Sequence, residues 1–267
     1  MLSAEQIEAA AKQLDKAETS LQQTQLMSVT YPDMTMQDAY AIQYGWVAEK
    51  LARGRKLIGH KIGLTSKVMQ QALNISTPDS GILFDDMLFA NGSTINKGRF
   101  IQPRVEAEIA FIMKRDLAGD NLTVDDVLDA TDYIAPSLEI LDTRIFRKCP
   151  ITGVMRNIMD TISDNAANAG IVLGDSKIDP RSVDMRWLGA IVSVNGDIEA
   201  TGLGAAVLNN PAMGIVWLAE RLADYNDTIR AGEIVLSGSF IAPIETQSGD
   251  HFHADFGHFG SVDLHFE

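Results

Sequence analysis

The sequence predicts an α+β protein built on an antiparallel or mixed β-sheet. Segments with the apolar alternation of strands outnumber helical segments, and the two kinds do not alternate in the regular order of parallel βαβ units. Helical periodicity instead gathers in residues 1–55. The pair Asn195-Gly196 lies between two strand-like segments, and this pair is the strongest short signal for an antiparallel hairpin.

The first part of the chain is expected to be a pair of helices. Each helix opens on a capping-box pair, Ser3 with Gln6 and Thr35 with Asp38. The region has too few large apolar side chains to form a core alone, so we expect it to pack on the rest of the chain. The sequence thus predicts a helical N-terminal region over residues 1–55 and a catalytic mixed-sheet domain over residues 56–267.

The elements of the second region follow from periodicity and from turn residues. Alternating or continuous apolar runs predict strands at 57–63, 104–113, 133–141, 170–173, 187–194, 197–201, 233–240 and 253–266. Helical spacing and capping residues predict helices at 65–73, at 123 to about 130, and at 211–222.

Composition excludes several classes of function. The net charge of 22 − 36 = −14 opposes binding to nucleic acid, whose phosphates need a basic surface. A single cysteine, Cys149, leaves no internal disulfide and no cysteine-based zinc site. No apolar run reaches the ~18 residues of a membrane span, and the N-terminus lacks the basic-then-apolar order of a signal peptide. We therefore expect a cytoplasmic protein without a nucleic-acid or membrane partner.

Two glutamates on one predicted strand are the first candidates for chemistry. In a strand over 104–113, Glu106 and Glu108 share a face because side chains alternate. If that face is buried, the carboxylates repel each other and lose hydration, and a divalent cation such as Mg²⁺ or Mn²⁺ would compensate. The alternative is that the face is simply open to solvent.

A third acid favours the metal interpretation. Glu139 stands in an apolar run, so its charge needs a partner. Arg144 could supply one as a salt bridge, or Glu139 could join Glu106 and Glu108 in a three-carboxylate site. Lys61, bracketed by Gly59 and Gly63, is either part of that site or extends to solvent.

A series of motifs runs in order along almost the whole sequence. They lie at 59–67 (GHKIGLTSK), 78–79 (PD), 84–87 (FDDM), 104–108 (RVEAE), 138–142 (LEILD), 160–170 (DTISDNAANAG) and 238–240 (GSF). Together they resemble the motifs of the 2-keto-4-pentenoate hydratase and 4-oxalocrotonate decarboxylase family of the fumarylacetoacetate hydrolase superfamily.

The resemblance implies a site and a fold. Matched residue by residue, it implies Mg²⁺ or Mn²⁺ held by Glu106, Glu108 and Glu139, with Lys61 and Asp79 at the reaction centre. It also implies a twisted mixed β-roll core of the fumarylacetoacetate hydrolase C-terminal type, and a homo-oligomer. Two serines in glycine- or asparagine-rich turns, Ser163 and Ser239, are candidates to bind a substrate carboxylate, or they cap their turns.

The resemblance further implies a small-molecule 2-oxo-enoic acid or diacid as substrate. The residues at 160–170 and the long segment at 145–159 resemble the corresponding segments of the family members that hydrate a seven-carbon diacid. Such an enzyme adds water to 2-oxohept-4-ene-1,7-dioate through a metal-bound dienolate, giving 4-hydroxy-2-oxoheptanedioate, in the breakdown of aromatic compounds. Three basic residues of the long segment could pair with the second carboxylate or lie on a basic surface loop: Arg147, Lys148 and Arg156.

Three alternatives remain open. A 2-oxopent-4-enoate hydratase or a 4-oxalocrotonate decarboxylase would use the same scaffold and the same carboxylates. A member without activity could serve as a partner or scaffold subunit. The C-terminal histidines, which include His251 and His253 on one strand face, are interpreted as ordinary surface residues, because a fitting third metal ligand is missing.

Overall fold

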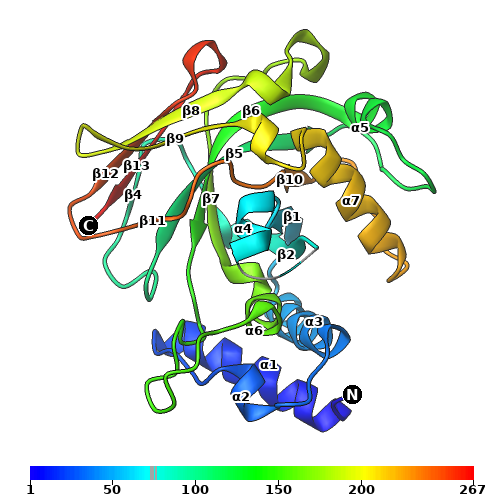
Figure 1. The fold of residues 1–267 in the computed structure, drawn as a ribbon, viewed down its shortest axis with the longest axis vertical. Helices are drawn as coiled ribbons and strands as arrows, with labels where there is room; N and C mark the ends of the chain where they lie inside the picture. Colours follow the sequence, from blue (N-terminus) through cyan, green and yellow to red (C-terminus); the bar gives the residue numbers. More distant parts are fainter. Residues whose placement is uncertain (73–74, 76) are drawn as a thin grey trace.

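The computed structural model describes residues 1–72, 75 and 77–267 (Figure 1). The N-terminal helices lie together at one end of the molecule, and strongly curved sheets occupy the other. Across the described ranges, every helix is too short or too polar to cross a membrane.

The N-terminal region begins with three helices, α1 (Ala4–Ser20), α2 (Met27–Thr30) and α3 (Met36–Ala52). Both predicted capping boxes are present. The Ser3 hydroxyl accepts from the Gln6 amide at 3.3 Å, and the Ser3 amide donates to the Gln6 side chain at 2.8 Å. Thr35 and Asp38 make the same reciprocal pair at the start of α3. A side-chain cap of this kind stabilises a helix by about 1 kcal/mol.

These helices pack on the rest of the chain rather than forming a separate core. Trp46 of α3 lies edge-on to Phe84, with ring centroids 5.8 Å apart, and both belong to a buried cluster that includes Ile145 and Ile162. The cluster therefore joins the helical region to the strands and loops that follow it. The boundary between residues 55 and 56 stays a prediction.

The first sheet holds most of the residues expected to carry chemistry. Within the described residues it has eight strands, in the order β2-β1-β10-β5-β6-β7-β3, with β11 beside β5. Their bounds are β1 (Leu57–Gly63), β2 (Asp79–Phe84), β3 (Leu88–Phe89), β5 (Arg104–Met113), β6 (Thr131–Leu141), β7 (Asn168–Leu173), β10 (Ile234–Leu236) and β11 (Ile244–Glu245). The β1–β10 and β3–β7 pairs are parallel and the others antiparallel, so the sheet is mixed.

The second sheet packs against the first and closes the main core. In the described chain it has five strands, in the order β4-β13-β12-β8-β9. Their bounds are β4 (Ser93–Ile95), β8 (Gly189–Val194), β9 (Asp197–Leu203), β12 (His251–Asp255) and β13 (Ser261–Phe266). The predicted hairpin joins β8 to β9, and Asn195 and Gly196 both have positive φ (55° and 92°), as a tight hairpin turn requires.

Four further helices are α4 (Lys67–Ala72), α5 (Val124–Ala130), α6 (Ile158–Ser163) and α7 (Pro211–Ala223). Most predicted elements are present, and the α+β class with a mixed sheet is confirmed. The predicted strand at 233–240 is shorter, because the chain turns at Gly238, whose φ is 114°. The predicted helix at 65–73 spans 67–72, and Leu73 lies outside the described residues.

Candidate active site

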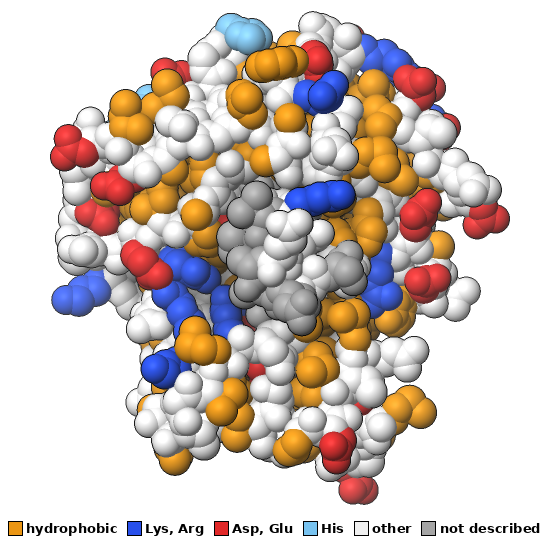
Figure 2. Space-filling model, viewed as in Figure 1, with side chains coloured by type: hydrophobic (Ala, Val, Ile, Leu, Met, Phe, Trp, Pro, Cys, Tyr) orange, Lys and Arg blue, Asp and Glu red, His pale blue; other side chains and the backbone are white. Residues whose placement is uncertain are grey.

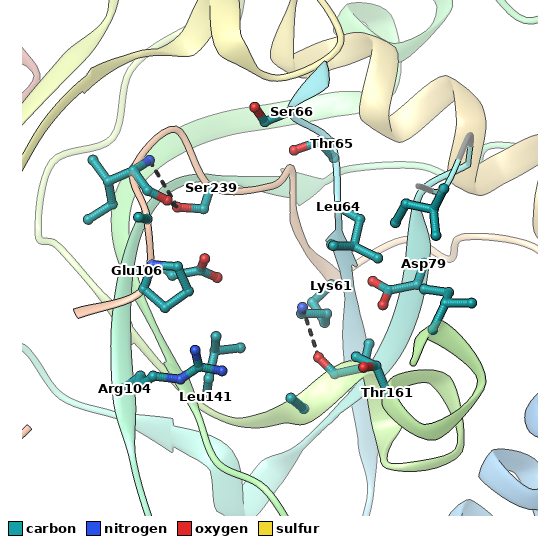
Figure 3. A pocket seen from close by; sticks show the side chains of 18 of the residues that line it. Lys61, Leu64, Thr65, Ser66, Asp79, Arg104, Glu106, Leu141, Thr161 and Ser239 are labelled. Carbon is teal, nitrogen blue, oxygen red and sulfur yellow. Dashed lines mark hydrogen bonds between the residues drawn. The ribbon is translucent and has the colours of Figure 1, made fainter. Parts of the chain in front are cut away.

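A cavity of about 830 Å³ is lined by residues of the first sheet and of the segments around it. Strands β1, β2 and β5 supply part of its wall, and residues of the 64–66, 155–167 and 239–243 segments supply much of the remainder. Figure 3 shows Arg104 and Glu106 on one side of the opening and Lys61 and Asp79 on the other. The motif residues from distant parts of the sequence therefore meet in one place.

The three glutamates converge at the base of this arrangement. In the antiparallel β5–β6 pair, Glu106 lies directly opposite Glu139, and Glu108 is opposite Ser137, which makes Glu108 a diagonal neighbour of Glu139. One carboxylate oxygen from each residue lies within 4.8 Å of the others. Glu108 and Glu139 are both 0% exposed, so the alternative of a solvent-facing strand face is wrong.

Two carboxylate oxygens of this cluster lack protein partners. Glu108 Oε2 accepts from the Gly238 amide at 2.9 Å, and Glu139 Oε1 accepts from Asn168 Nδ2 at 2.7 Å. The second oxygens, Glu108 Oε1 and Glu139 Oε2, are buried and accept no hydrogen bond from any described residue. Buried carboxylate oxygens without donors are costly unless a cation or a proton occupies the space between them. A set of hard oxygen ligands that leaves positions open fits Mg²⁺ or Mn²⁺.

Burial has the largest effect on the protonation of this cluster. It raises the pKa of Glu106 to about 8, with the charge of Glu139 adding to the effect. Burial and the charge of Glu139 likewise raise the pKa of Glu108 well above its ordinary value. Without a cation, the cluster therefore retains protons at neutral pH.

Lys61 and Asp79 lie beside the cluster. The Lys61 ammonium donates to the Ala166 carbonyl at 3.1 Å and lies 3.4 Å from Glu139 Oε1. Burial alone lowers the pKa of Lys61, but the charges of Glu139 and Asp79 outweigh it and the net pKa is raised. Burial raises the pKa of Asp79 to about 6, although the Lys61 charge opposes the shift. Lys61 thus stays charged, while Asp79 titrates near neutral pH.

Gly63 allows Lys61 and Asp79 to approach each other. A Cβ atom at position 63 would overlap Asp79 Oδ1 and would lie 3.0 Å from Lys61 Nζ. The glycine that follows Lys61 on β1 is therefore needed for close approach rather than for a special backbone angle. This explains the second of the two glycines that bracket Lys61 in the sequence.

The two candidate serines differ in position. Ser239 lines the cavity, where its hydroxyl donates to the Ile241 carbonyl at 2.8 Å and accepts from the Ile241 amide at 3.2 Å (Figure 3). It therefore caps its turn at the cavity wall. Ser163 is fully buried at the end of α6 and is not part of the wall, whereas Thr161 of the same helix is. A role for either serine in substrate binding stays a prediction.

Arg144 does not pair with Glu139. It is buried and bonded to the Asp164 carboxylate, and its guanidinium also donates to the Asn168 carbonyl at 3.1 Å. Asn168 in turn donates to Glu139, so Arg144 supports the cluster through the backbone of Asn168. Asn168 was not among the predicted site residues, although it lies within the 160–170 motif.

Three arginines line the cavity. Arg147 and Arg156 are among its wall residues, whereas Lys148 is exposed and outside the wall. Arg104, which was not among the predicted site residues, also lines it. Its position two residues before Glu106 could have indicated this, because alternate residues of a strand share a face. Burial, and then repulsion from Arg147 and Arg156, lowers the pKa of Arg104 to about 10.

The histidines near the C-terminus lie away from this cavity. His251 and His253 both bond to Asp263, at 2.8 Å and 2.9 Å. Within the described part of the chain, Glu106, Glu108 and Glu139 are the only group with the geometry of a metal site.

Known proteins resemble this chain over its full length. A 2-oxo-hept-4-ene-1,7-dioate hydratase of Escherichia coli is 50% identical over 96% of each chain. A 2-keto-4-pentenoate hydratase of Paraburkholderia xenovorans is 40% identical over 100% of this chain and 97% of its own. The chain belongs to the 2-keto-4-pentenoate hydratase and 4-oxalocrotonate decarboxylase family. It matches no family model.

A solved structure of the same family has the same fold. The 4-oxalocrotonate decarboxylase from Pseudomonas putida G7, complexed with magnesium and adipate, superposes with a TM-score of 0.94 at 31% identity, over 100% of this chain and 99% of that chain. Two solved structures with only 11% and 15% identity share the fold, with TM-scores of 0.57 and 0.53. The family and fold predicted from the motifs are confirmed, and so is the prediction of an enzyme.

Proposed function

We propose that this protein is a metal-dependent hydratase that converts 2-oxohept-4-ene-1,7-dioate into 4-hydroxy-2-oxoheptanedioate in the breakdown of aromatic compounds. The observation that carries the proposal is the convergence of Glu106, which lines the cavity with Lys61 and Asp79, and the buried Glu108 and Glu139 behind it. The 50% identity to a hydratase of this diacid supports the choice of substrate within the family.

Glu106, Glu108 and Glu139 would hold the divalent cation. The unpartnered, buried oxygens of Glu108 and Glu139 and the magnesium ion in the related decarboxylase support Mg²⁺, and Mn²⁺ fits the same donors. When bound, the cation acts as a Lewis acid that stabilises the negative charge developing on the 2-keto oxygen of the substrate. Asn168 and the Gly238 amide orient the carboxylates by holding one oxygen of Glu139 and of Glu108.

Asp79 and Lys61 would handle the protons. The reaction moves a proton from C3 to C5, which brings the double bond into conjugation with the ketone, and water then adds to C4 while C3 is protonated again. We assign the proton at C3 to Asp79, because a pKa of about 6 lets this group accept and return a proton near neutral pH. Lys61 keeps its charge, orients Asp79 and Glu139, and donates to the developing anion.

Decarboxylation of 4-oxalocrotonate is the second candidate, favoured by the close structural match to a decarboxylase. To separate the two, protein stripped with EDTA is incubated with and without Mg²⁺, and with five- and seven-carbon 2-oxo-enoates or 4-oxalocrotonate. Loss of the conjugated chromophore and release of CO₂ are followed in parallel. We expect Mg²⁺-dependent hydration of the seven-carbon diacid without CO₂ release. Release of CO₂ from 4-oxalocrotonate in place of hydration would identify a decarboxylase.

Variants test the proposed metal site. Glu106→Gln should abolish Mg²⁺-dependent turnover, and Glu199→Gln, at an exposed position of β9, should leave it unchanged. If wild type and Glu106→Gln are equally inactive on all substrates, the chain is an inactive partner subunit. Full activity of Glu106→Gln would contradict the metal site.

We further propose that the protein is a cytoplasmic homo-oligomer. Its β8–β9 surface supports an interface between copies, because large apolar side chains are exposed there. The β8–β9 register places Ile191, Ile198 and Leu203 on the same face of the sheet. Trp187, which is 73% exposed, precedes β8. An apolar patch of this kind on a sheet is typical of a protein–protein contact.

A further inference from the structure

Arg104 is an unpaired arginine in the cavity wall. Among the described residues, its guanidinium makes no hydrogen bond and no ion pair, although the charges of Glu106 and Glu245 act on it, and its buried Nε atom has no acceptor. Figure 3 shows the side chain directed into the cavity, next to Glu106. A guanidinium offers five donors in a planar fork that matches a carboxylate. Its lack of a protein partner points to a ligand.

Arg144 shows what a structural arginine looks like in the same fold. It is buried, is bonded to the Asp164 carboxylate, and also donates to the Asp164 and Asn168 carbonyls. Each of its three guanidinium nitrogens therefore donates to an acceptor of the protein. Arg104 lines an open cavity and lacks such partners, so the same chemical group is left available to a ligand.

Two more guanidinium groups lie at the same part of the wall. Arg156 donates to Thr143 Oγ1 at 3.2 Å and makes no ion pair with a described residue. Arg147 is more fully used, since it bonds to Glu245 at 2.5 Å and to the Gln102 carbonyl at 2.8 Å. Figure 2 shows several Lys and Arg side chains grouped on this face, although the protein as a whole is acidic. Positive charges this close repel each other unless an anion joins them.

The spacing along β5 fits the length of the proposed substrate. Arg104 and Glu106 are two residues apart on the same face of a strand, which corresponds to about 7 Å. The carboxyl carbons of a seven-carbon diacid are joined by six bonds and lie about 7–8 Å apart when the chain is extended. A diacid with its 2-oxo end at Glu106, Glu108 and Glu139 therefore reaches Arg104 with its far end. Met155, Met159 and Ile241 offer apolar wall for the carbon chain.

We propose that Arg104 and Arg156 form a subsite for the far carboxylate of the substrate, and that this subsite selects diacids over monoacids. The inference rests on the proposed function, because it places the 2-oxo end at the glutamates. Arg147, held by Glu245, adds positive potential without donating to the ligand. A monoacid would leave the two guanidinium groups without a partner, and an unmade hydrogen bond to a charged group weakens binding.

Binding of two inert ligands tests the subsite without turnover. 2-Oxoheptanedioate and 2-oxoheptanoate have the same length and the same 2-oxo acid end, lack the double bond, and differ only in the far carboxylate. Isothermal titration calorimetry of the full-length protein with Mg²⁺ measures both dissociation constants. We expect the wild type to bind the diacid about 10- to 100-fold more tightly, as one or two charge-assisted hydrogen bonds would give.

The variants assign that preference to residues. Arg104→Gln should bring the ratio of the two dissociation constants close to one, mainly by weakening the binding of the diacid. Arg104→Lys should restore part of the preference for the diacid. Arg156→Gln should lower the ratio as well. Lys148→Gln removes the same charge from an exposed position outside the wall, and it should keep the wild-type ratio.

The outcomes separate the subsite from the proposed reaction. Equal affinity of the wild type for both ligands would contradict the proposed subsite. A loss of affinity in Arg104→Gln that is equal for diacid and monoacid would contradict it as well. A diacid preference that depends on Arg104 supports the subsite even if hydration of the enoates fails, in which case only the proposed reaction is wrong.

Discussion

Glu106 and Glu139 lie directly opposite each other in the antiparallel β5–β6 pair, and their carboxylates converge with that of Glu108. Like charges in this cross-strand position destabilise a sheet. The protein tolerates the arrangement because burial raises the pKa of Glu106, so that a proton is retained when no cation is present. The site is thus poised to exchange protons for a metal ion.

The metal-free protein should lose stability as pH rises from about 5 to 8. Glu106 has a pKa of about 8 when folded and an ordinary value of 4.5, so the folded state binds more protons than the unfolded state in this window. The free energy of unfolding must then fall with pH. The raised pKa values of Glu108 and Asp79 act in the same direction.

Urea unfolding of EDTA-treated protein at pH 5.5, 7 and 8.5 measures this slope. Glu108→Gln should reduce the slope, because one titrating group is removed and the amide stays neutral. Stability of the wild type that increases over the same interval would show that these carboxyls are ionised in the folded, metal-free protein.

Affinity for Mg²⁺ should increase with pH over the same range. Binding of the cation must displace the protons that Glu106 and Glu108 retain, so a lower pH competes with the metal. Calorimetric titration of the protein with Mg²⁺ in two buffers of different ionisation enthalpy gives the number of protons released on binding. Binding without proton release at pH 7 would contradict the prediction.

Asp79→Asn should reduce turnover by about 10²- to 10⁴-fold while Mg²⁺ binding is kept, because a general base is lost and the three ligands remain. In the wild type, kcat/KM should rise with pH through about 6, as Asp79 becomes ionised. The matched measurement is the pH profile of both proteins with the seven-carbon substrate. A rising limb near pH 6 that persists in Asp79→Asn would assign the base to another residue.

Replacing the exposed apolar residues of the β8–β9 surface should reduce the size of the assembly. Trp187→Ser combined with Ile198→Ser removes two side chains that are 73% and 67% exposed and contribute little to the core. Light scattering coupled to size-exclusion chromatography gives the mass of both proteins. Met213→Ser, at an exposed apolar position on α7, is the control. A variant with the wild-type mass would place the interface elsewhere.

Local elements were predictable because their causes are local. Capping boxes at Ser3 and Thr35, the alternation of β5 and the turn at Asn195-Gly196 depend on residues that are neighbours in sequence. Strand β2 was not predicted, because all of its residues are buried and it shows no alternation. The family motifs also indicated the glutamates, Lys61 and Asp79 before any geometry was known.

Sequence patterns alone were enough for most of the element types, the acidic composition and the residue types available for chemistry. The folded arrangement was needed to show that Glu139 meets Glu106, that Arg144 pairs with Asp164 and supports Asn168, and that no described residue bonds to the Arg104 guanidinium beside the cavity. Each of these relations depends on strand register or on loops that are distant along the chain. The periodicity of apolar residues indicates which face of a helix or strand is buried. Contacts between elements depend on the packing of the whole core.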